Sequence, residues 1–296
     1  MKFILSDEST KYFITNPTRY AMKTEDKLIR YFFPDNVLDL PNPTLHIYGI
    51  QLHDMNLLDE KNVNVMICVE NCAHHQHYKH YNRFGDFGND KIHIYFYNHI
   101  DRCVVTSKYI AIPVIYSQMR YFSQYYETIA PTIYTPTEQK KFCLFATSPE
   151  NYMRKEKMQI MSFLSSMGEC HDIRGYAHVI GDKSCYHSTE LLNVLNQYKF
   201  VFVSENSIAD GYITEKIFNC LFARTIPIYY GSKKISRYIN PRAFIEIDTH
   251  DLTEARDRIM KATDDILSEP KISDTYNDEN YDVLLKSFID TLQIYK

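Results

Sequence analysis

Residues 199–231, "KFVFVSENSIADGYITEKIFNCLFARTIPIYYG", carry the pattern that decides the fold. The apolar run 199–203 predicts a buried strand, residues 214–223 predict an amphipathic helix, and residues 225–231 predict a second strand. Strand, helix and strand in alternation are typical of a parallel sheet with helices on both faces. Ligands of such sheets bind beyond the C-terminal ends of the strands, which is where this segment places a polar loop.

The polar loop and the helical turn after it concentrate residues suited to a nucleotide sugar. A helix N-terminus offers unpaired N–H groups and the positive end of a dipole, and both favour phosphate. Lys216 is electrostatically unfavourable in that turn, so a negatively charged ligand explains its position better. Glu205 and Asn206 can hydrogen-bond sugar hydroxyls. Tyr212 can cover a base or ribose, and Glu215 can accept hydroxyl protons.

The same loop also allows a purely structural interpretation. Residues 207–210, "SIAD", fit a capping box, in which a serine and a later carboxyl group satisfy free N–H groups at a helix start. Spacing alone does not choose between this capped helix and a ligand site.

The pattern of short apolar runs continues on both sides of this segment. In the second half, residues 141–147 predict a strand and 151–167 a helix, on which Lys157 shares one side with Ile160 and Leu164. Residues 189–197 predict another helix, and the tail of the chain is helical. In the first half three runs predict strands: 44–50, 63–69 and 109–116.

Two α/β units are expected from this organisation. Residues 127–140 contain two prolines and no apolar periodicity, which is typical of a linker. We therefore expect an N-terminal α/β domain over residues 1–130 and a C-terminal Rossmann-like domain over residues 131–296. The two would face each other across a cleft, with C-terminal helices packing back on the first domain.

Composition excludes several classes of protein. The 296 residues have a net charge of -4 and a pI near 6.3, so no global basic field indicates a nucleic-acid partner or an anionic membrane. The N-terminal apolar stretch is too short for a signal peptide, and no run is long enough for a membrane span. Seven cysteines, an odd number, do not form a disulfide framework. The expectation is a soluble, cytoplasmic protein.

Residues 198–244 resemble the signature region of the α-1,3-fucosyltransferases, glycosyltransferase family 10. In that family a strand leads into Glu-Asn-Ser or Glu-Asn-Thr and then into a Tyr-Val/Ile-Thr-Glu-Lys helix start. The matching pieces here are Glu205-Asn206-Ser207, Tyr212-Ile213-Thr214-Glu215-Lys216, Ile226-Pro227-Ile228 with Gly231, and Asn240-Pro241. The sequence of this segment is most similar to the bacterial members, which also have a glycine, here Gly211, before the tyrosine.

Weaker similarity extends upstream and covers residues 62–245 in total. Arg154 matches the arginine that opens a helix after a strand and a short polar loop. Glu70 and Asn71 match a Gly-Glu-Asn strand end, with Val69 in place of the glycine. No part of the sequence resembles the N-terminal anchor of animal members or the heptad-repeat tail of bacterial ones, so membrane docking through such a tail is not expected.

The resemblance implies a GT-B fold and transfer of L-fucose from GDP-fucose, with inversion, to a glycan hydroxyl. Residues 1–130 would form the acceptor-side domain and residues 131–296 the GDP-sugar-binding domain. An α-1,3 linkage to N-acetylglucosamine or glucose is the family's usual product. Lys216 and Arg154 would neutralise the pyrophosphate without an essential metal, and Glu70 would be the general base. The remaining donor-site residues implied by the match are Glu205, Asn206, Ser207, Tyr212 and Glu215.

Three other interpretations remain at this point. A related GT-B enzyme could use another GDP-sugar, or the chain could bind nucleotide or glycan without turnover. Cys68, Cys72 and the histidines of residues 74–80 also look superficially like zinc ligands. No second ligand pair accompanies them, so a loop contacting the sugar acceptor is the preferred interpretation of that segment.

Overall fold

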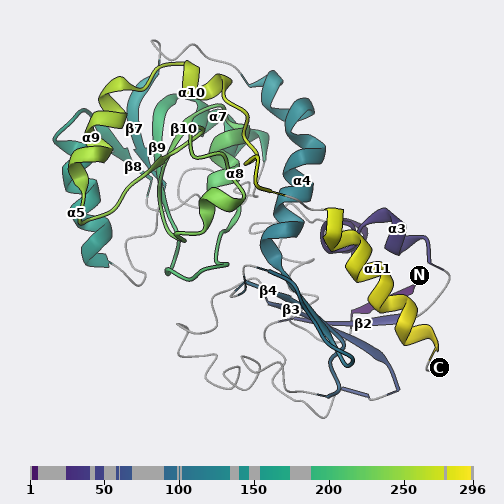
Figure 1. The fold of residues 1–296 in the computed structure, drawn as a ribbon. Helices are drawn as coiled ribbons and strands as arrows, with labels where there is room; N and C mark the ends of the chain where they lie inside the picture. The colour runs from purple at the N-terminus through teal and green to yellow at the C-terminus, as the bar shows by residue number, and fades with distance from the viewer. Residues whose placement is uncertain are drawn as a thin grey trace. The chain divides into compact units, whose positions relative to one another are not determined.

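The chain is described by a computed structural model over residues 2–5, 25–40, 44–49, 58–59, 61–68, 90–98, 100, 102–133, 140–146, 154–173, 188–276 and 279–294. It divides into two compact units (Figure 1). Unit 1 comprises Met1–Arg120 together with Asn277–Lys296, and unit 2 comprises Tyr121–Tyr276. Within the described residues, none of the helices combines the length and the apolar character that crossing a bilayer requires.

Unit 1 is built on a mainly parallel sheet with the strand order β1-β2-β3-β4-β6-β5. Only the short β5 runs antiparallel, against β6. The strands are β1 (Lys2–Leu5), β2 (Thr44–Gly49), β3 (Val63–Cys68), β4 (Ile94–Tyr97), β5 (Val104–Val105) and β6 (Ile110–Pro113). The helices are α2 (Glu25–Phe32), α3 (Asp35–Leu38), the first part of α4 (Val114–Ile129), and α11 (Glu279–Ile294).

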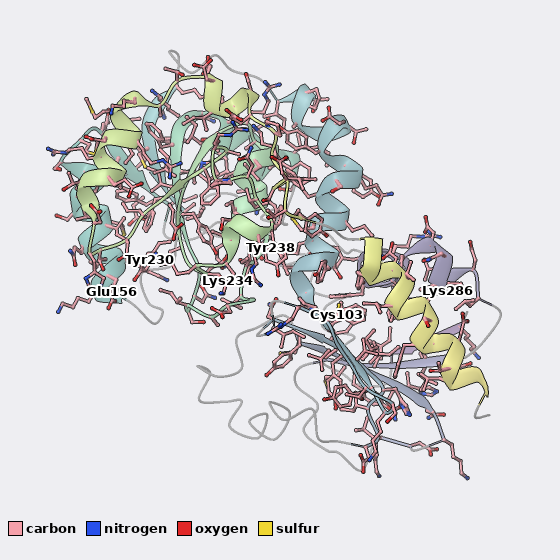
Figure 2. The ribbon with its side chains drawn as sticks, viewed as in Figure 1. Cys103, Glu156, Tyr230, Lys234, Tyr238 and Lys286 are labelled. Carbon is pink, nitrogen blue, oxygen red and sulfur yellow. The ribbon has the colours of Figure 1, made fainter. Side chains whose placement is uncertain are left out.

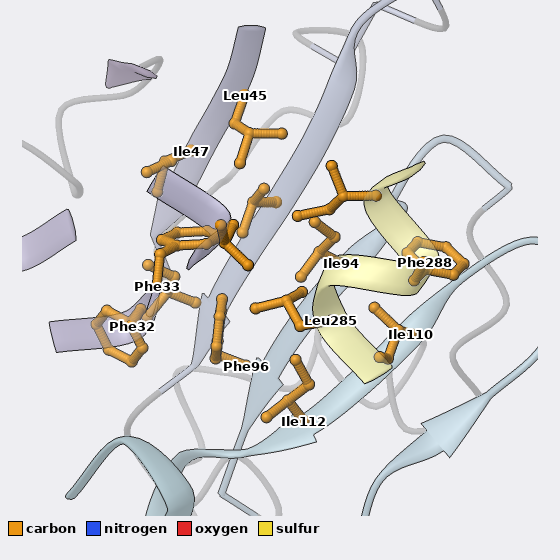
Figure 3. Close-up of a cluster of buried hydrophobic side chains, with 14 of the residues drawn as sticks. Phe32, Phe33, Leu45, Ile47, Ile94, Phe96, Ile110, Ile112, Leu285 and Phe288 are labelled. Carbon is orange, nitrogen blue, oxygen red and sulfur yellow. The ribbon is translucent and has the colours of Figure 1, made fainter. Parts of the chain in front are cut away.

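Alternating side chains of this sheet pack into one core with α2 and α11 (Figure 3). Phe96 of β4 contacts the rings of Phe32 and Phe33, at centroid distances of 4.9 and 5.2 Å. From α11, Leu285 and Phe288 fill the same cluster. The C-terminal helix therefore completes the N-terminal core, as expected from the sequence.

Unit 2 is built on a fully parallel sheet with the order β11-β10-β9-β7-β8. Its strands are β7 (Lys141–Phe145), β8 (Cys170–Asp172), β9 (Tyr198–Ser204), β10 (Ile226–Tyr230) and β11 (Ile245–Glu246). Its helices are α5 (Arg154–Ser165), α7 (Thr189–Asn196), α8 (Glu215–Phe222), α9 (Leu252–Lys261) and α10 (Asp265–Ser268), with short 3₁₀ turns at Ala130–Thr132 and Ile235–Arg237.

Helices cover both faces of the second sheet (Figure 1). Phe200 and Phe202 of β9 point into a core shared with α5 and α9, where Ile160 and Ile259 are buried. On the opposite face α7 and α8 pack against β9. The α/β class and the parallel, doubly covered sheet predicted from residues 199–231 are confirmed.

One apolar run was assigned wrongly from the sequence. Residues 109–116 predicted a single strand, but β6 ends at Pro113 and α4 begins at Val114. Val114 and Ile115 are both buried, so an unbroken apolar run continues from strand into helix and hides the boundary. Helix α4 also occupies residues 127–129 of the expected linker, and residues 134–139 lie outside the described part of the chain.

The division between the units falls inside α4, between Arg120 and Tyr121, and not at residue 130. Side-chain contacts explain this position. The Arg120 guanidinium donates to the carbonyl oxygen of Tyr31 at 2.6 Å, which belongs to unit 1. Two residues later, the Phe122 ring packs on Phe218 at 5.3 Å, which belongs to unit 2.

Candidate functional site

The loop 205–214 leaves the C-terminal end of β9 and leads directly into α8. Because β7, β9 and β10 are parallel, their C-terminal ends share this edge of the sheet. Helix α8 begins at Glu215, so residues 207–210 do not form the capping box that the sequence allowed. The residue before the helix is Thr214, whose side chain makes no capping bond. Its hydroxyl is directed to another partner.

Glu205 is the buried centre of this loop. The residue is fully buried, yet its carboxylate is well supplied with donors. Oε1 accepts from the Thr214 N–H at 2.8 Å, and Oε2 accepts from the Thr214 hydroxyl at 2.8 Å. The Lys216 ammonium lies 3.2 Å from Oε2, and the Tyr229 hydroxyl donates to Oε1 at a longer 3.4 Å. A buried carboxylate is stable only with such compensation, so this network fixes the helix start.

Lys216 is held in the first turn of α8 by the same network. Its ammonium donates to the Thr214 hydroxyl at 2.9 Å as well as to Glu205, and it lies 4.0 Å from the Glu215 carboxylate. The Lys216 side chain is 15% exposed. The structure therefore presents a positioned cation at a helix N-terminus, where the backbone dipole alone favours an anion.

Gly231 is required by the close approach of Tyr229 beneath it. A Cβ atom at Gly231 would lie 2.6 Å from Cζ of Tyr229 and 2.7 Å from Cγ of Glu205. The Ser232 N–H donates to the Tyr229 hydroxyl at 3.2 Å. Burial and the negative charge of Glu205 raise the pKa of Tyr229 well above its ordinary value, so Tyr229 remains a neutral hydrogen-bond donor.

Lys157 is a second cation at this edge, and its surroundings are unusual. It lies in the first turns of α5 and is only 1% exposed. None of the described residues hydrogen-bonds its ammonium. Burial lowers the pKa of Lys157 to about 8, with a further lowering by the charge of Lys216 and an opposing effect of Glu205. The neighbouring Glu156 of α5 interacts with Tyr230, at the end of β10 (Figure 2).

Replacing Lys157 with methionine is expected to stabilise the protein at neutral pH. Below pH 8 the folded state contains a buried charge that the unfolded state exposes to water. Between pH 8 and 10.5 only the unfolded state holds this proton, so the wild-type free energy of unfolding recovers as pH rises. The gain in Lys157→Met should be roughly 3 kcal/mol at pH 7 and should shrink by pH 10.

Urea unfolding of both proteins at several pH values measures this effect. Lys155→Met is the matched control, because Lys155 lies on the same helix and is exposed. A gain in stability that does not depend on pH would contradict the assignment.

The other predicted site residues fall into three groups. Tyr212 and Ser207 are buried, at 1% and 2% exposure, so the Tyr212 ring has no open face for a base in this structure. Asn206 and Glu215 are partly exposed at the same edge. Arg154 is the first residue of α5, and its side chain lies outside the described part of the structure.

Two sequence expectations fall on residues that the structure does not describe. Glu70 comes two residues after Cys68, the last residue of β3, and both it and the histidine-rich residues 74–80 are outside the described ranges. Among the residues that are described, no group of three or more His, Cys, Asp or Glu side chains could hold a metal ion.

Comparisons with known proteins show which family this site resembles. Residues 137–265 match the model of the glycosyltransferase family 10 (fucosyltransferase) C-terminal domain. The chain is 35% identical over 98 residues to the α-(1,3)-fucosyltransferase FucT of Helicobacter pylori, covering 33% of this chain and 18% of that protein. It is 27% identical over 113 residues to GDP-fucose protein O-fucosyltransferase 3 of Danio rerio, covering 38% of this chain and 23% of the relative. The chain thus spans about a fifth of the length of these curated relatives.

Solved structures extend the likeness to most of the chain. A crystal structure of alpha1,3-fucosyltransferase covers 92% of this chain and 89% of its own, with a TM-score of 0.59 and 16% identity. A crystal structure of alpha1,3-fucosyltransferase with GDP-fucose covers 83% and 78%, with a TM-score of 0.53 and 18% identity. These similarities show the fold, which is the GT-B fold expected from the sequence. Over residues 137–265, the chain is similar to the C-terminal domain of the glycosyltransferase family 10 fucosyltransferases.

Proposed function

We propose that this protein is an inverting fucosyltransferase that moves L-fucose from GDP-fucose to a hydroxyl of a glycan, forming an α-1,3 linkage to N-acetylglucosamine or glucose. The observation that supports this most directly is the Lys216–Thr214–Glu205 network. It holds a cation at the C-terminal edge of a parallel sheet, within the segment that matches the fucosyltransferase family. The crystal structure with GDP-fucose has the same fold.

The chemistry requires stabilisation of a leaving group. The acceptor oxygen forms a bond to the anomeric carbon of fucose while the bond from that carbon to the β-phosphate oxygen breaks. Both electrons of the broken bond remain on GDP, which departs with additional negative charge. The Lys216 ammonium would stabilise that charge, and Arg154 at the start of α5 would be its partner. Glu70 would take the proton of the acceptor hydroxyl.

The other residues divide between contact and positioning. Asn206 and Glu215, which are partly exposed, are assigned to contact the nucleotide sugar. Tyr212 and Ser207 were expected at the same ligand from the sequence, but both are buried, so we assign them to the packing of the loop. Glu205 was first assigned to the same ligand, but its carboxylate is buried and bonded to Thr214 and Lys216. We therefore assign Glu205 a positioning role through Lys216. The charge stabilisation proposed here uses cationic side chains and includes no metal.

GDP release by the purified protein tests the proposal. GDP-fucose and GDP-mannose are supplied in parallel, with and without N-acetyllactosamine, in the presence and absence of EDTA. We expect release from GDP-fucose only, dependent on acceptor and insensitive to EDTA. Mass spectrometry and NMR of the product identify the linkage and the anomeric configuration.

Each other result overturns a part of this assignment. Release from GDP-mannose would indicate a transferase for a different GDP-sugar. Loss of release in EDTA would contradict a metal-independent mechanism. Binding of GDP without release from either donor, over a panel of lactosamine and glucose acceptors, would indicate a nucleotide-binding protein without turnover.

A further inference from the structure

Lys157 is a buried cation for which the described structure provides no hydrogen-bonding partner. The side chain is 1% exposed, and its ammonium donates no hydrogen bond to any described residue. Leaving such a charge unpaired is costly, because transfer from water removes hydrogen bonds that nothing replaces. A protein that retains this arrangement is expected to use the charge.

A comparison within the same unit shows how a structural lysine is accommodated. Lys271 is also buried, with 8% of its surface exposed, and its ammonium donates to three carbonyl oxygens at the end of α10. These distances are 3.2 Å to Ile266, 2.8 Å to Leu267 and 2.7 Å to Glu269. Lys271 thus stabilises a helix terminus, whereas Lys157 has no such acceptor among the described residues.

The position of Lys157 indicates what its partner is. It lies near the N-terminus of α5, which follows β7, and α5 covers the sheet beside β9. Among the described residues, Lys216 at the start of α8 and Glu205 after the end of β9 are the charged groups that affect the pKa of Lys157. The carboxylate of Glu205 is already bonded to Thr214 and Lys216, so it does not neutralise a second cation. Two ammonium groups therefore lie near a single buried carboxylate, which pairs with Lys216 alone.

We propose that Lys157 is an anion-binding residue of the nucleotide site and contacts the diphosphate of the donor together with Lys216. A diphosphate carries enough negative charge to compensate both ammonium groups, which a single carboxylate or a neutral sugar does not. This inference rests on the proposed function for the identity of the nucleotide. It adds to the site a residue from α5 that the family-like motif around Lys216 does not contain.

Binding measurements with three probes test it. The affinities of GDP, inorganic pyrophosphate and guanosine are measured by calorimetry for wild type, Lys157→Met and the exposed-charge control Lys155→Met. We expect Lys157→Met to weaken GDP and pyrophosphate by about 10- to 100-fold, as for one charge-assisted hydrogen bond. Guanosine affinity, which involves no phosphate, should change less than about twofold in both variants, and Lys155→Met should match wild type.

The outcomes separate this inference from the proposed function. The inference would be overturned if Lys157→Met bound GDP and pyrophosphate with the same affinities as wild type. It would also be overturned if wild type bound neither anion. Wild type that binds both anions through Lys157 but releases no GDP from GDP-fucose would retain the inference and remove the fucosyltransferase assignment. If Lys157→Met does not fold, Lys157→Gln replaces it under the same criteria.

Discussion

Replacing Lys216 with methionine is expected to lower kcat/KM for fucose transfer by about 10²–10³-fold. The ammonium at the start of α8 stabilises charge that develops on GDP as the bond to fucose breaks, and methionine provides no compensating donor. Glu205 keeps its two bonds from Thr214 and the long contact from Tyr229, so the loop retains most of its anchoring. The main loss should therefore be in kcat.

Steady-state kinetics with GDP-fucose measure this loss, with circular dichroism as a check of folding. Lys155→Met removes one positive charge from an exposed position of the same unit and should keep wild-type kinetics. If Lys216→Met is folded and retains more than about a tenth of wild-type kcat/KM, Lys216 does not stabilise the leaving group as proposed.

Replacing Glu205 with alanine is expected to lower the free energy of unfolding by about 3–5 kcal/mol and to abolish detectable transfer. The change removes the acceptor for two groups of Thr214, for Lys216 and for Tyr229, all at one buried point. Donors left without an acceptor each carry a desolvation cost. Urea unfolding measures the stability, and Asp257→Ala, an exposed carboxylate on α9, should stay within about 0.5 kcal/mol of wild type.

A double-mutant cycle distinguishes positioning from direct contact with the ligand. Glu205→Gln keeps the shape of the side chain but removes its charge, and its effect on kcat should largely disappear when Lys216 is already methionine. Additive effects of Glu205→Gln and Lys216→Met would show that Glu205 acts independently of Lys216. That result would restore the direct sugar contact first inferred from the sequence.

The longer elements of unit 2 could be predicted because their apolar runs end at polar residues, whereas the two- and three-residue strands β8 and β11 were not predicted. Residues 199–203 and 225–231 correspond closely to β9 and β10, and residues 214–223 to α8. The prediction of a single strand over residues 109–116 was wrong because burial continues from β6 into α4 without a polar residue between them.

The candidate site shows a similar limit of sequence reasoning. Lys216 was recognisable because a cation in a first helical turn opposes the helix dipole. The role of Glu205 was not, because its acceptance of bonds from Thr214 and Tyr229 depends on the folded loop. The sequence did indicate that Lys157 is unusual, because it is a charged residue on the apolar side of a predicted helix. Only the structure shows that this side chain is buried.

The location of α11 has a consequence for how the chain is made. Leu285 and Phe288 complete the core of unit 1, yet the whole of unit 2 lies before them in the chain, between Tyr121 and Tyr276. A ribosome therefore produces the complete second sheet before it produces the helix that covers the first. Unit 2 can fold while unit 1 still lacks part of its core, which reverses the usual order in which N-terminal domains fold first during synthesis.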